Sequence, residues 1–243
     1  MTKLSVVGIG PGNYENMSVL ADRVLRECDI IVGYHVYVDL VRGRYANKEY
    51  YTSPMTREAE RCRMALKLAE SGKNVALVCS GDSGIYGMAA LVYELRGESR
   101  SPEIEIVPGL TAACSGAALL GAPLSHDFAV ISLSDRLTPW EKIEKRLECA
   151  AMADMSIVLY NPSSRGRSGH LRRACDILLS CLPEDRLCGV SRNIGREGEK
   201  AWLLSLKELR DAELDMFCTV FIGNEMSREI GGKFITPRGY KDV

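Results

Sequence analysis

The residues Val75-Ala76-Leu77-Val78-Cys79 are followed directly by Ser80-Gly81-Asp82-Ser83-Gly84-Ile85-Tyr86-Gly87. The first stretch is entirely apolar, which is typical of a strand buried on both faces of a parallel sheet. The second stretch is rich in glycine and leads into a helix-like stretch over residues 88–95. A buried strand, a glycine-rich turn and a helix together form the repeating unit of an α/β fold.

The same order of elements recurs on either side of this stretch. Apolar runs predict further strands at 4–9, 30–32 and 104–107, and helical spacing predicts helices at 18–28, 58–70 and 111–120. Strands that alternate with helices need crossover connections, so we expect a largely parallel sheet.

The composition changes near Gly121-Ala122-Pro123, and a second set of elements follows. We therefore expect two α/β domains, residues 1–122 and 123–243. In the second, strands are predicted at 128–133, 156–160, 187–191, 201–204 and 218–222, and helices at 138–153 and 171–182. The shorter spacings predict some antiparallel pairing. Thr138-Pro139-Trp140-Glu141 predicts a capping box with Thr138 as N-cap.

The overall composition is that of an ordinary globular protein. The chain has 243 residues, 46% of them hydrophobic, and 31 basic against 32 acidic side chains give a net charge of −1. This balance provides no global basic field for nucleic-acid binding. The N-terminus lacks the pattern of a signal peptide, and the weakly charged stretch 106–125 is broken by glycine and proline, so we expect a cytoplasmic protein without a membrane span.

The nine cysteines are scattered and form no C-x-x-C pair. This spacing predicts reduced, buried thiols and no metal site. An iron–sulfur cluster assembled from distant cysteines is the less favoured alternative.

Three glycine-containing loops follow three successive strands and predict one concave site at the carboxyl edge of the sheet. The first, Gly8-Ile9-Gly10-Pro11-Gly12, has Asn13 where a dinucleotide-binding fingerprint needs glycine, and no P-loop pattern occurs. In the second, the Asp82 carboxylate would repel phosphate but suits a ligand with hydroxyls, an amine or a sulfonium; Asp82 could equally cap its own turn. The third, 108–113, opens a helix of small residues.

Four segments of the sequence are similar to the S-adenosylmethionine-dependent tetrapyrrole methyltransferases of cobalamin biosynthesis. They are the first loop, Gly81 to Met88, Val107 to Ala113, and Thr236-Pro237-Arg238-Gly239-Tyr240. Longer motifs resemble the branch that methylates C17 of precorrin-3B: His126 to Asp135 with Leu137 to Trp140, Leu159 to Pro162, Arg192 to Glu199, and Ile222 to Asn224.

The resemblance implies a class III tetrapyrrole methyltransferase fold, with two α/β domains that form a cleft for S-adenosylmethionine, usually in a homodimer. The implied reaction is methyl transfer to C17 of precorrin-3B or cobalt-precorrin-3, with ring contraction. Carried over by motif, the cofactor residues are Pro11, Ser80, Gly81, Asp82, Ile85, Thr111, Ala112, Asn161 and Ala201.

Ring contraction needs proton movement, for which His126 and Asp127 are candidates, although such a pair also forms structural turns. His35 beside Tyr34 and Tyr37 could border the cleft, or it could be a packed surface histidine. The substrate carries several carboxylates. Arginine suits carboxylates, so we expect substrate contacts from arginines in glycine-rich loops, namely Arg165, Arg192, Arg196 and Arg238; the alternative is a solvated surface.

Two other functions remain open at the level of sequence. One is a methyltransferase of the same fold that acts at another macrocycle carbon, on diphthine or on RNA ribose. The other is a carrier that binds precorrins without catalysis. The reaction product separates the first from the C17 reaction, and cofactor titration separates the second.

Overall fold

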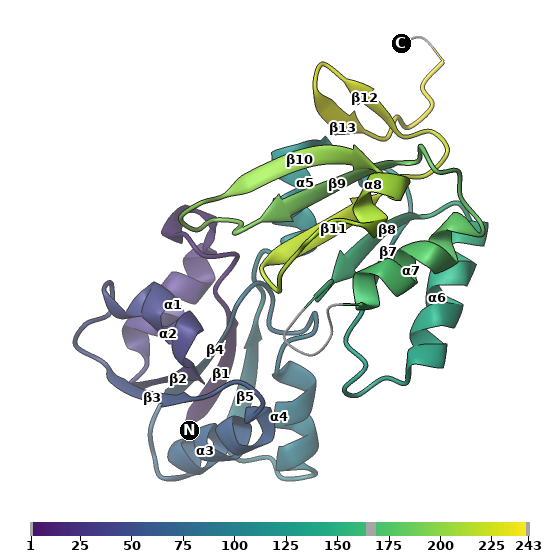
Figure 1. The fold of residues 1–243 in the computed structure, drawn as a ribbon. Coiled ribbons are helices and arrows are strands. Elements are labelled where there is room, and N and C mark those ends of the chain that lie inside the picture. The colour runs from purple at the N-terminus through teal and green to yellow at the C-terminus, as the bar shows by residue number, and fades with distance from the viewer. Residues whose placement is uncertain (1, 164–168, 242–243) are drawn as a thin grey trace. The chain divides into compact units, whose positions relative to one another are not determined.

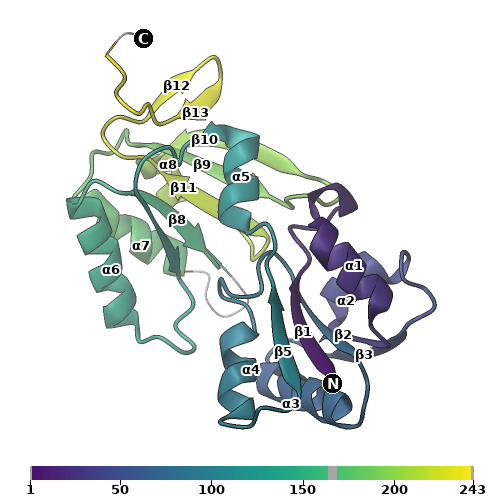
Figure 2. The ribbon, with the colours of Figure 1, turned by 180° about the vertical axis from the view of Figure 1, so that it is seen from behind.

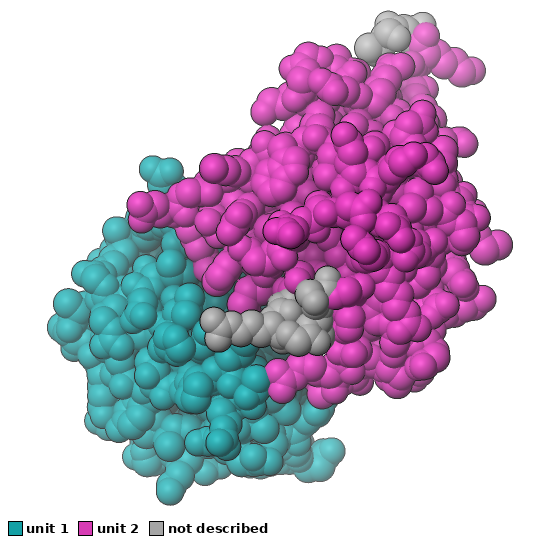
Figure 3. Space-filling view, in the orientation of Figure 1, with its two compact units in different colours: residues 1–112 teal, residues 113–243 magenta. Residues whose placement is uncertain are grey.

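The computed structural model describes residues 2–163 and 169–241. The chain divides into two compact units, Met1–Ala112 and Ala113–Val243 (Figure 3). The division lies earlier than the boundary expected after residue 122. The reason is that helix α5, Ala112–Leu120, contributes Ala113, Ala117 and Leu120 to a core with residues of the second sheet.

The first unit is built on a five-stranded sheet whose strands all run parallel (Figure 1). The order is β3-β2-β4-β1-β5. The strands are β1 Lys3–Gly8, β2 Ile30–Tyr34, β3 Glu49–Ser53, β4 Val75–Cys79 and β5 Glu103–Val107. The predicted parallel sheet is confirmed.

Helices cover both faces of this sheet. On one face, α1 (Val19–Glu27) and α2 (His35–Arg42) form a core with Val7, Ile31 and Val78. On the other face, α3 (Glu58–Glu70) and α4 (Ala89–Arg96) form a core with Val6, Val32 and Leu77. Successive residues of a strand point to opposite faces, which explains why β4 is apolar throughout.

The second unit contains a five-stranded mixed sheet in the order β10-β9-β11-β8-β7. Its strands are β7 Phe128–Ser132, β8 Ser156–Tyr160, β9 Leu187–Arg192, β10 Lys200–Ser205 and β11 Cys218–Ile222. Only the β7–β8 pair in this sheet is parallel, and the other pairs are antiparallel, as the short spacings predicted.

Helix α5 lies over one face of the second sheet, where it forms a core with Val158, Phe221 and Phe234 (Figure 2). The helices on the other face, α6 (Trp140–Met152), α7 (His170–Leu179) and α8 (Leu206–Arg210), share a second core. A small third sheet joins β6 Gly121–Ala122, β12 Arg228–Ile230 and β13 Lys233–Ile235. None of the helices in the described ranges has the length and apolar character needed to cross a membrane.

The expected capping box at Thr138 is wrong. Helix α6 begins at Trp140, and Pro139 is its N-cap, with an extended ψ of 144° and no side-chain cap. The Trp140 ring is buried, so the first helical residue is the one that packs into the core. A capping box that was not predicted does occur at α8, where Ser205 and Glu208 cap each other's backbone.

Several short elements were also missed, among them α2, β3, α8 and the third sheet. Strand β3 (Glu49–Ser53) illustrates the reason: it lies at the edge of the first sheet and none of its residues is fully buried. A half-exposed edge strand carries no continuous apolar run, which is the signal that identified the central strands.

Candidate cofactor and substrate site

The three glycine loops of the first unit meet at one edge of its sheet. They follow β1, β4 and β5, which are neighbours in the order β4-β1-β5 and run parallel, so all three loops leave from the carboxyl edge. The connection after β1 leads to α1 on one face, whereas the connection after β4 leads to α4 on the other. Adjacent strands whose connections diverge in this way open the crevice in which α/β proteins bind ligands.

The first two loops are joined through their backbones. The Gly81 N–H donates to the Gly10 carbonyl at 2.7 Å, and the Gly10 N–H donates to the Gly81 carbonyl at 3.1 Å. Both glycines have positive φ, 75° at Gly10 and 69° at Gly81. This conformation is costly for other residues, so the short bridge between the loops depends on glycine at both positions.

Asp82 joins the second loop to the third. Its Oδ1 accepts the N–H groups of Gly84 at 2.7 Å and Ile85 at 3.0 Å, and its Oδ2 accepts the Gly109 N–H at 2.9 Å. A carboxylate offers about four acceptor positions. Three are used within the protein, so the main task of Asp82 is to hold the loops together, and it can accept at most one further bond from a ligand.

Ser83 provides a second connection between the second loop and the strand that precedes the third loop. It is fully buried, and its hydroxyl donates to the Val107 carbonyl at the end of β5 at 2.9 Å. The backbones pack closely here: a Cβ added to Gly109 would lie 2.2 Å from the Gly81 carbonyl oxygen. The three loops therefore form one tightly packed platform.

Large apolar side chains remain exposed around this platform. Ile85, Tyr86 and Leu110 are all exposed, although each lies within or beside a predicted cofactor loop. The other predicted cofactor residues of this unit lie in the same loops or directly after them: Pro11 and Thr111 are buried, and Ser80, Gly81 and Ala112 are partly buried. The platform thus combines rigid backbone with apolar surface, the combination that small-molecule sites need.

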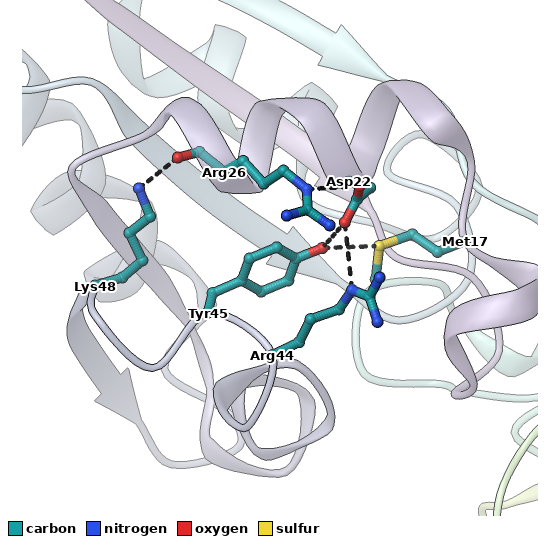
Figure 4. A network of polar contacts seen from close by, with 6 residues as sticks. All are labelled: Met17, Asp22, Arg26, Arg44, Tyr45 and Lys48. Carbon is teal, nitrogen blue, oxygen red and sulfur yellow. Dashed lines mark hydrogen bonds and ion pairs between the residues drawn. The ribbon is translucent and has the colours of Figure 1, made fainter.

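A network of polar contacts fixes the segment that follows the first loop (Figure 4). The Tyr45 hydroxyl donates to Asp22 at 2.6 Å, and Arg26 donates to the same carboxylate at 2.8 Å. Arg44 lies 3.5 Å from Asp22 and stacks on the ring of Tyr14, which follows the loop. The hydrogen bond from Arg26, with help from Tyr45 and Arg44, lowers the pKa of Asp22 to about 2.

A buried arginine lies at the same carboxyl edge and was missed by the sequence analysis. The Arg61 guanidinium donates to the Ser53 hydroxyl and the Pro54 carbonyl, both at 2.9 Å, and reaches the Met88 sulfur. Within residues 2–163 and 169–241 it has no carboxylate partner. It ties the end of β3 to the loop that follows β4. The burial of Arg61 could not be predicted from its place in the sequence, because an arginine on an amphipathic helix is usually solvated.

In the second unit, several predicted residues share the edge at which β7 and β8 end. Asn161 follows β8 with φ 55° and donates to the Ser132 hydroxyl at 2.9 Å. Strand β9 ends and β10 begins at the same edge, which brings Arg192 and Ala201 there. We call this the carboxyl edge of the second sheet.

The two predicted arginines at this edge already have partners. Arg192 donates to Asp215 at 2.6 Å, and the Arg196 guanidinium lies over the Phe217 ring at 5.7 Å. Ala201 is exposed on the outer strand β10 and pairs with Ser191. The fourth arginine position, Arg165, lies outside the described residues.

His126, Asp127 and Arg238 lie at the opposite edge of the second sheet. His126 and Asp127 precede β7 and line a cavity of about 690 Å³ together with Asp154, Asn224 and Met226. The segment that leads to Arg238 is bonded nearby, since Thr236 donates to the Pro123 carbonyl at 2.7 Å.

In this unit, the residues predicted for catalysis and those predicted to bind the cofactor therefore lie at opposite edges of the sheet. Five strand residues, Ser156–Tyr160, separate the two edges along β8. At about 3.3 Å per residue this is roughly 16 Å. His126 and Asp127 therefore lie at the other edge of the sheet from Asn161, and their catalytic role stays a prediction.

A second histidine cluster lies at the carboxyl edge and was not predicted. The His170 Nδ1 lies 2.9 Å from the Leu133 carbonyl oxygen, and its Nε2 lies 3.6 Å from Asp135 Oδ2. The Trp140 ring packs against the imidazole at a centroid distance of 4.9 Å. Asp135 follows a predicted strand and could have been found from that position; His170 carries no local signal.

The cysteines form no metal site among the residues that the structure describes. All nine are free. Cys28, Cys62, Cys79, Cys175, Cys188 and Cys218 are buried, as predicted, but the prediction was wrong for Cys114, Cys149 and Cys181, which are exposed on helices or just after one.

Comparison with known proteins gives consistent results across the chain. Residues 3–210 match the family described as Tetrapyrrole (Corrin/Porphyrin) Methylases. A protein of Salmonella typhimurium named probable cobalt-factor III C(17)-methyltransferase is 47% identical over 98% of this chain and 99% of its own length.

Solved structures agree with this result. The methyltransferase CobJ is 34% identical, with a TM-score of 0.90 over 98% of this chain and all of its own. A uroporphyrin-III C-methyltransferase from Thermus thermophilus, solved with S-adenosylhomocysteine, shares the fold with a TM-score of 0.72 over 91% of this chain and 97% of its own, at 20% identity.

Proposed function

Because this chain belongs to the tetrapyrrole (corrin/porphyrin) methylase family, we propose that it transfers the methyl group of S-adenosylmethionine to C17 of cobalt-factor III or of precorrin-3. The observation that carries this proposal is the similarity to the Salmonella protein, 47% identity over nearly the full length of both chains. A relation that covers both units supports a shared reaction, whereas a shared fold alone would not.

The loop platform of the first unit fits the proposed cofactor. S-adenosylmethionine supplies an electrophilic methyl group on a sulfonium. Its adenosine and methionine parts offer hydroxyls, an amine and a carboxylate, which backbone N–H and C=O groups can bind, and an apolar ring that Ile85 and Leu110 can cover. The Asp82 carboxylate keeps these loops in place and retains capacity for one ligand donor.

Methyl transfer to carbon depends more on the positioning of the reactants than on a strong base among the side chains. The reacting carbon and the sulfonium methyl must approach in line, and water must be excluded, so positioning provides most of the rate enhancement. A rigid platform with two backbone hydrogen bonds between Gly10 and Gly81 is suited to that task.

Three further features of the proposed function are implied by the family resemblance. They are ring contraction after methylation, assembly as a homodimer, and a location in the cytoplasm. Light scattering of the purified protein tests the dimer, and the absorption spectrum of the product separates simple methylation from methylation with contraction.

The first test is calorimetric titration of the protein with S-adenosylhomocysteine, followed by incubation with S-adenosylmethionine and cobalt-factor III. We expect saturable binding and a product with one added methyl group, placed at C17 by NMR. Binding of S-adenosylhomocysteine at 100 times its Kd should also stabilise the fold by about 2.7 kcal/mol.

Two results would contradict the proposal. Methylation at another carbon would assign the protein to a different branch of the family. Macrocycle binding without any cofactor binding would favour a precorrin carrier.

A further inference from the structure

A buried positive charge lies at the carboxyl edge of the first sheet without an acidic side chain to neutralise it. Arg61 is only 4% exposed, and none of the ion pairs among residues 2–163 and 169–241 includes it. Arginine stays protonated in proteins, and a buried charge is costly unless an opposite charge pairs with it. By contrast, Arg192, one of the predicted substrate contacts, is already paired with Asp215. Arg61 is therefore suited to pair with an anionic group from outside the chain.

The hydrogen bonds of Arg61 use only part of its donor capacity. A guanidinium has five N–H groups. Nε donates to the Ser53 hydroxyl and Nη2 to the Pro54 carbonyl, both at 2.9 Å, whereas Nη1 reaches the Met88 sulfur at 3.5 Å. A thioether is a weak acceptor, so Nη1 is the poorly satisfied end of the group. The remaining two N–H groups have no acceptor in the described part of the chain.

The contact with Met88 places Arg61 beside the second glycine loop. Met88 directly follows Gly87, the last residue of that loop, and is the N-cap of α4. A methionine side chain is unbranched and flexible, so it can move aside for another group. A carboxylate that replaced the Met88 sulfur at Nη1 would exchange a weak acceptor for a charged one.

Aromatic rings lie next to the guanidinium. Tyr34 is the last residue of β2, and the centre of its ring lies 6.0 Å from Arg61 Cζ. The rings of His35 and Tyr37 pack edge-on against Tyr34, with centroid distances of 4.4 and 5.1 Å. His35 is exposed, and the two tyrosines are partly buried. Aromatic surface beside a cation suits a conjugated ligand that also carries negative charge.

We propose that Arg61 and the aromatic cluster of Tyr34, His35 and Tyr37 form a subsite for a carboxylate group of a bound ligand, with Arg61 as the residue that pairs with the carboxylate. The choice of ligands rests on the proposed function. Both reactants have this chemistry, because the macrocycle carries several carboxylates and S-adenosylmethionine carries one on its methionine part. The aromatic cluster favours the macrocycle, whose carboxylates surround a large ring system.

Replacing Arg61 with methionine removes the charge and keeps an unbranched apolar side chain in its place. With saturating S-adenosylmethionine, we expect Arg61→Met to raise KM for cobalt-factor III about 10- to 100-fold, the range for a lost hydrogen bond to a charged group. The kcat should stay close to that of the wild type, because a contact made equally in the ground state and the transition state changes KM alone.

Two cofactor ligands identify the source of the carboxylate. S-adenosylhomocysteine has the methionine-derived carboxylate, and methylthioadenosine lacks it. If Arg61 holds a carboxylate of the macrocycle, both cofactor ligands should bind Arg61→Met as they bind the wild type in calorimetric titration. If Arg61 holds the carboxylate of the cofactor, binding of S-adenosylhomocysteine should weaken by the same factor while methylthioadenosine binds unchanged.

Two further variants complete the comparison. Arg61→Lys keeps the charge but lacks the planar fork of donors, so its KM should lie between those of the wild type and Arg61→Met. It also carries the test if Arg61→Met does not fold. Arg57→Met is the matched control, because Arg57 lies at the start of the same helix but is exposed and paired with Glu60. This control should leave KM unchanged.

The outcomes separate the inference from the proposed function. A raised KM, or a selective loss of S-adenosylhomocysteine binding, in a folded variant supports the inference. Folded variants that keep both values overturn it, and so does an equal loss for all three ligands, which would mean that Arg61 only holds the fold. A wild type that methylates no carbon of the tetrapyrrole overturns the proposed function alone, because titration with cobalt-factor III and the two cofactor ligands still decides the inference. A wild type that binds none of the three overturns both.

Discussion

A single carboxylate organises the predicted cofactor site. The type of residue and its glycine-rich context pointed to a ligand contact at Asp82, yet three backbone N–H groups occupy its oxygens. A charge-assisted bond to a backbone N–H is stronger than a neutral one. Asp82 therefore contributes to binding mainly by keeping the second and third loops at a fixed separation.

Two substitutions test whether Asp82 acts through the loops. Ser83 is fully buried and cannot touch a ligand, but its hydroxyl supports the same loops through Val107. If loop position controls binding, Ser83→Ala should weaken S-adenosylhomocysteine binding by about 1 kcal/mol, the usual value of one hydrogen bond. Asp82→Asn should weaken binding more, and Asp82→Ala most. Calorimetric titration of the three variants measures this order.

A different result would point to direct contact. If Asp82→Asn and Asp82→Ala abolish binding while Ser83→Ala matches the wild type, Asp82 contacts the ligand and its loop contacts are secondary.

Among the secondary structure elements, α1 is joined to the segment that follows α2 by a partly buried hydrogen bond as well as by apolar packing. Asp22 on α1 accepts from Tyr45, which follows α2, and from Arg26 one turn further along α1. Tyr45 is also within hydrogen-bonding reach of the Met17 sulfur (Figure 4). The network thereby ties the end of the first loop segment to both helices on that face of the sheet.

The network predicts a dependence of stability on acid. The pKa of Asp22 is lowered to about 2 in the folded protein, from 3.8, so its contribution is complete above about pH 4 and is lost as the pH falls toward 2. Because Arg26 and Arg44 are partly exposed to solvent, we expect Asp22→Asn to cost about 1 to 2 kcal/mol at pH 7. Urea unfolding at several pH values measures this difference.

The pH dependence of this stability difference checks its electrostatic origin. The stability curves of the wild type and Asp22→Asn should converge between pH 4 and pH 2, because protonated Asp22 resembles asparagine. A difference that is the same at pH 7 and pH 2 would exclude an electrostatic origin. Asp39→Asn is a suitable control, since Asp39 is an exposed partner of Arg42 on α2.

At the scale of the whole molecule, each unit has two cores, one on either face of its sheet. These cores contain most of the cysteines. Burial raises the pKa of the thiols in both units, to about 11 at Cys28, Cys79 and Cys218 and to about 12 at Cys62 and Cys175. Since the thiolate is the reactive form, these groups should be inert in the folded protein.

Thiol reactivity therefore reports on the integrity of both units. With a disulfide reagent under native conditions, we expect fast reaction at Cys114, Cys149 and Cys181 and slow reaction at the other six cysteines until the protein unfolds. Absorbance of the released chromophore counts the fast group, and Cys181→Ser should lower that count by one. Fast reaction of all nine before unfolding would contradict the described burial.

The local patterns of the chain were sufficient to predict the central strands, most of the long helices, the parallel first sheet and the three glycine loops. Apolar periodicity and glycine-rich turns act over a few residues, so they can be read without knowing what lies across the fold. Helix α1 shows this, since it was predicted at 18–28 and is found at Val19–Glu27.

Contacts between distant segments could not be predicted in this way. The Asn161–Ser132 and His170–Leu133 bonds join residues 29 and 37 positions apart, and they exist because β7 and β8 run parallel and end together. The same strand directions place His126 at the far edge, away from Asn161. Strand order and direction depend on the packing of whole elements, and for that reason the folded structure alone distinguishes the histidine beside the predicted site from the one that the sequence favoured.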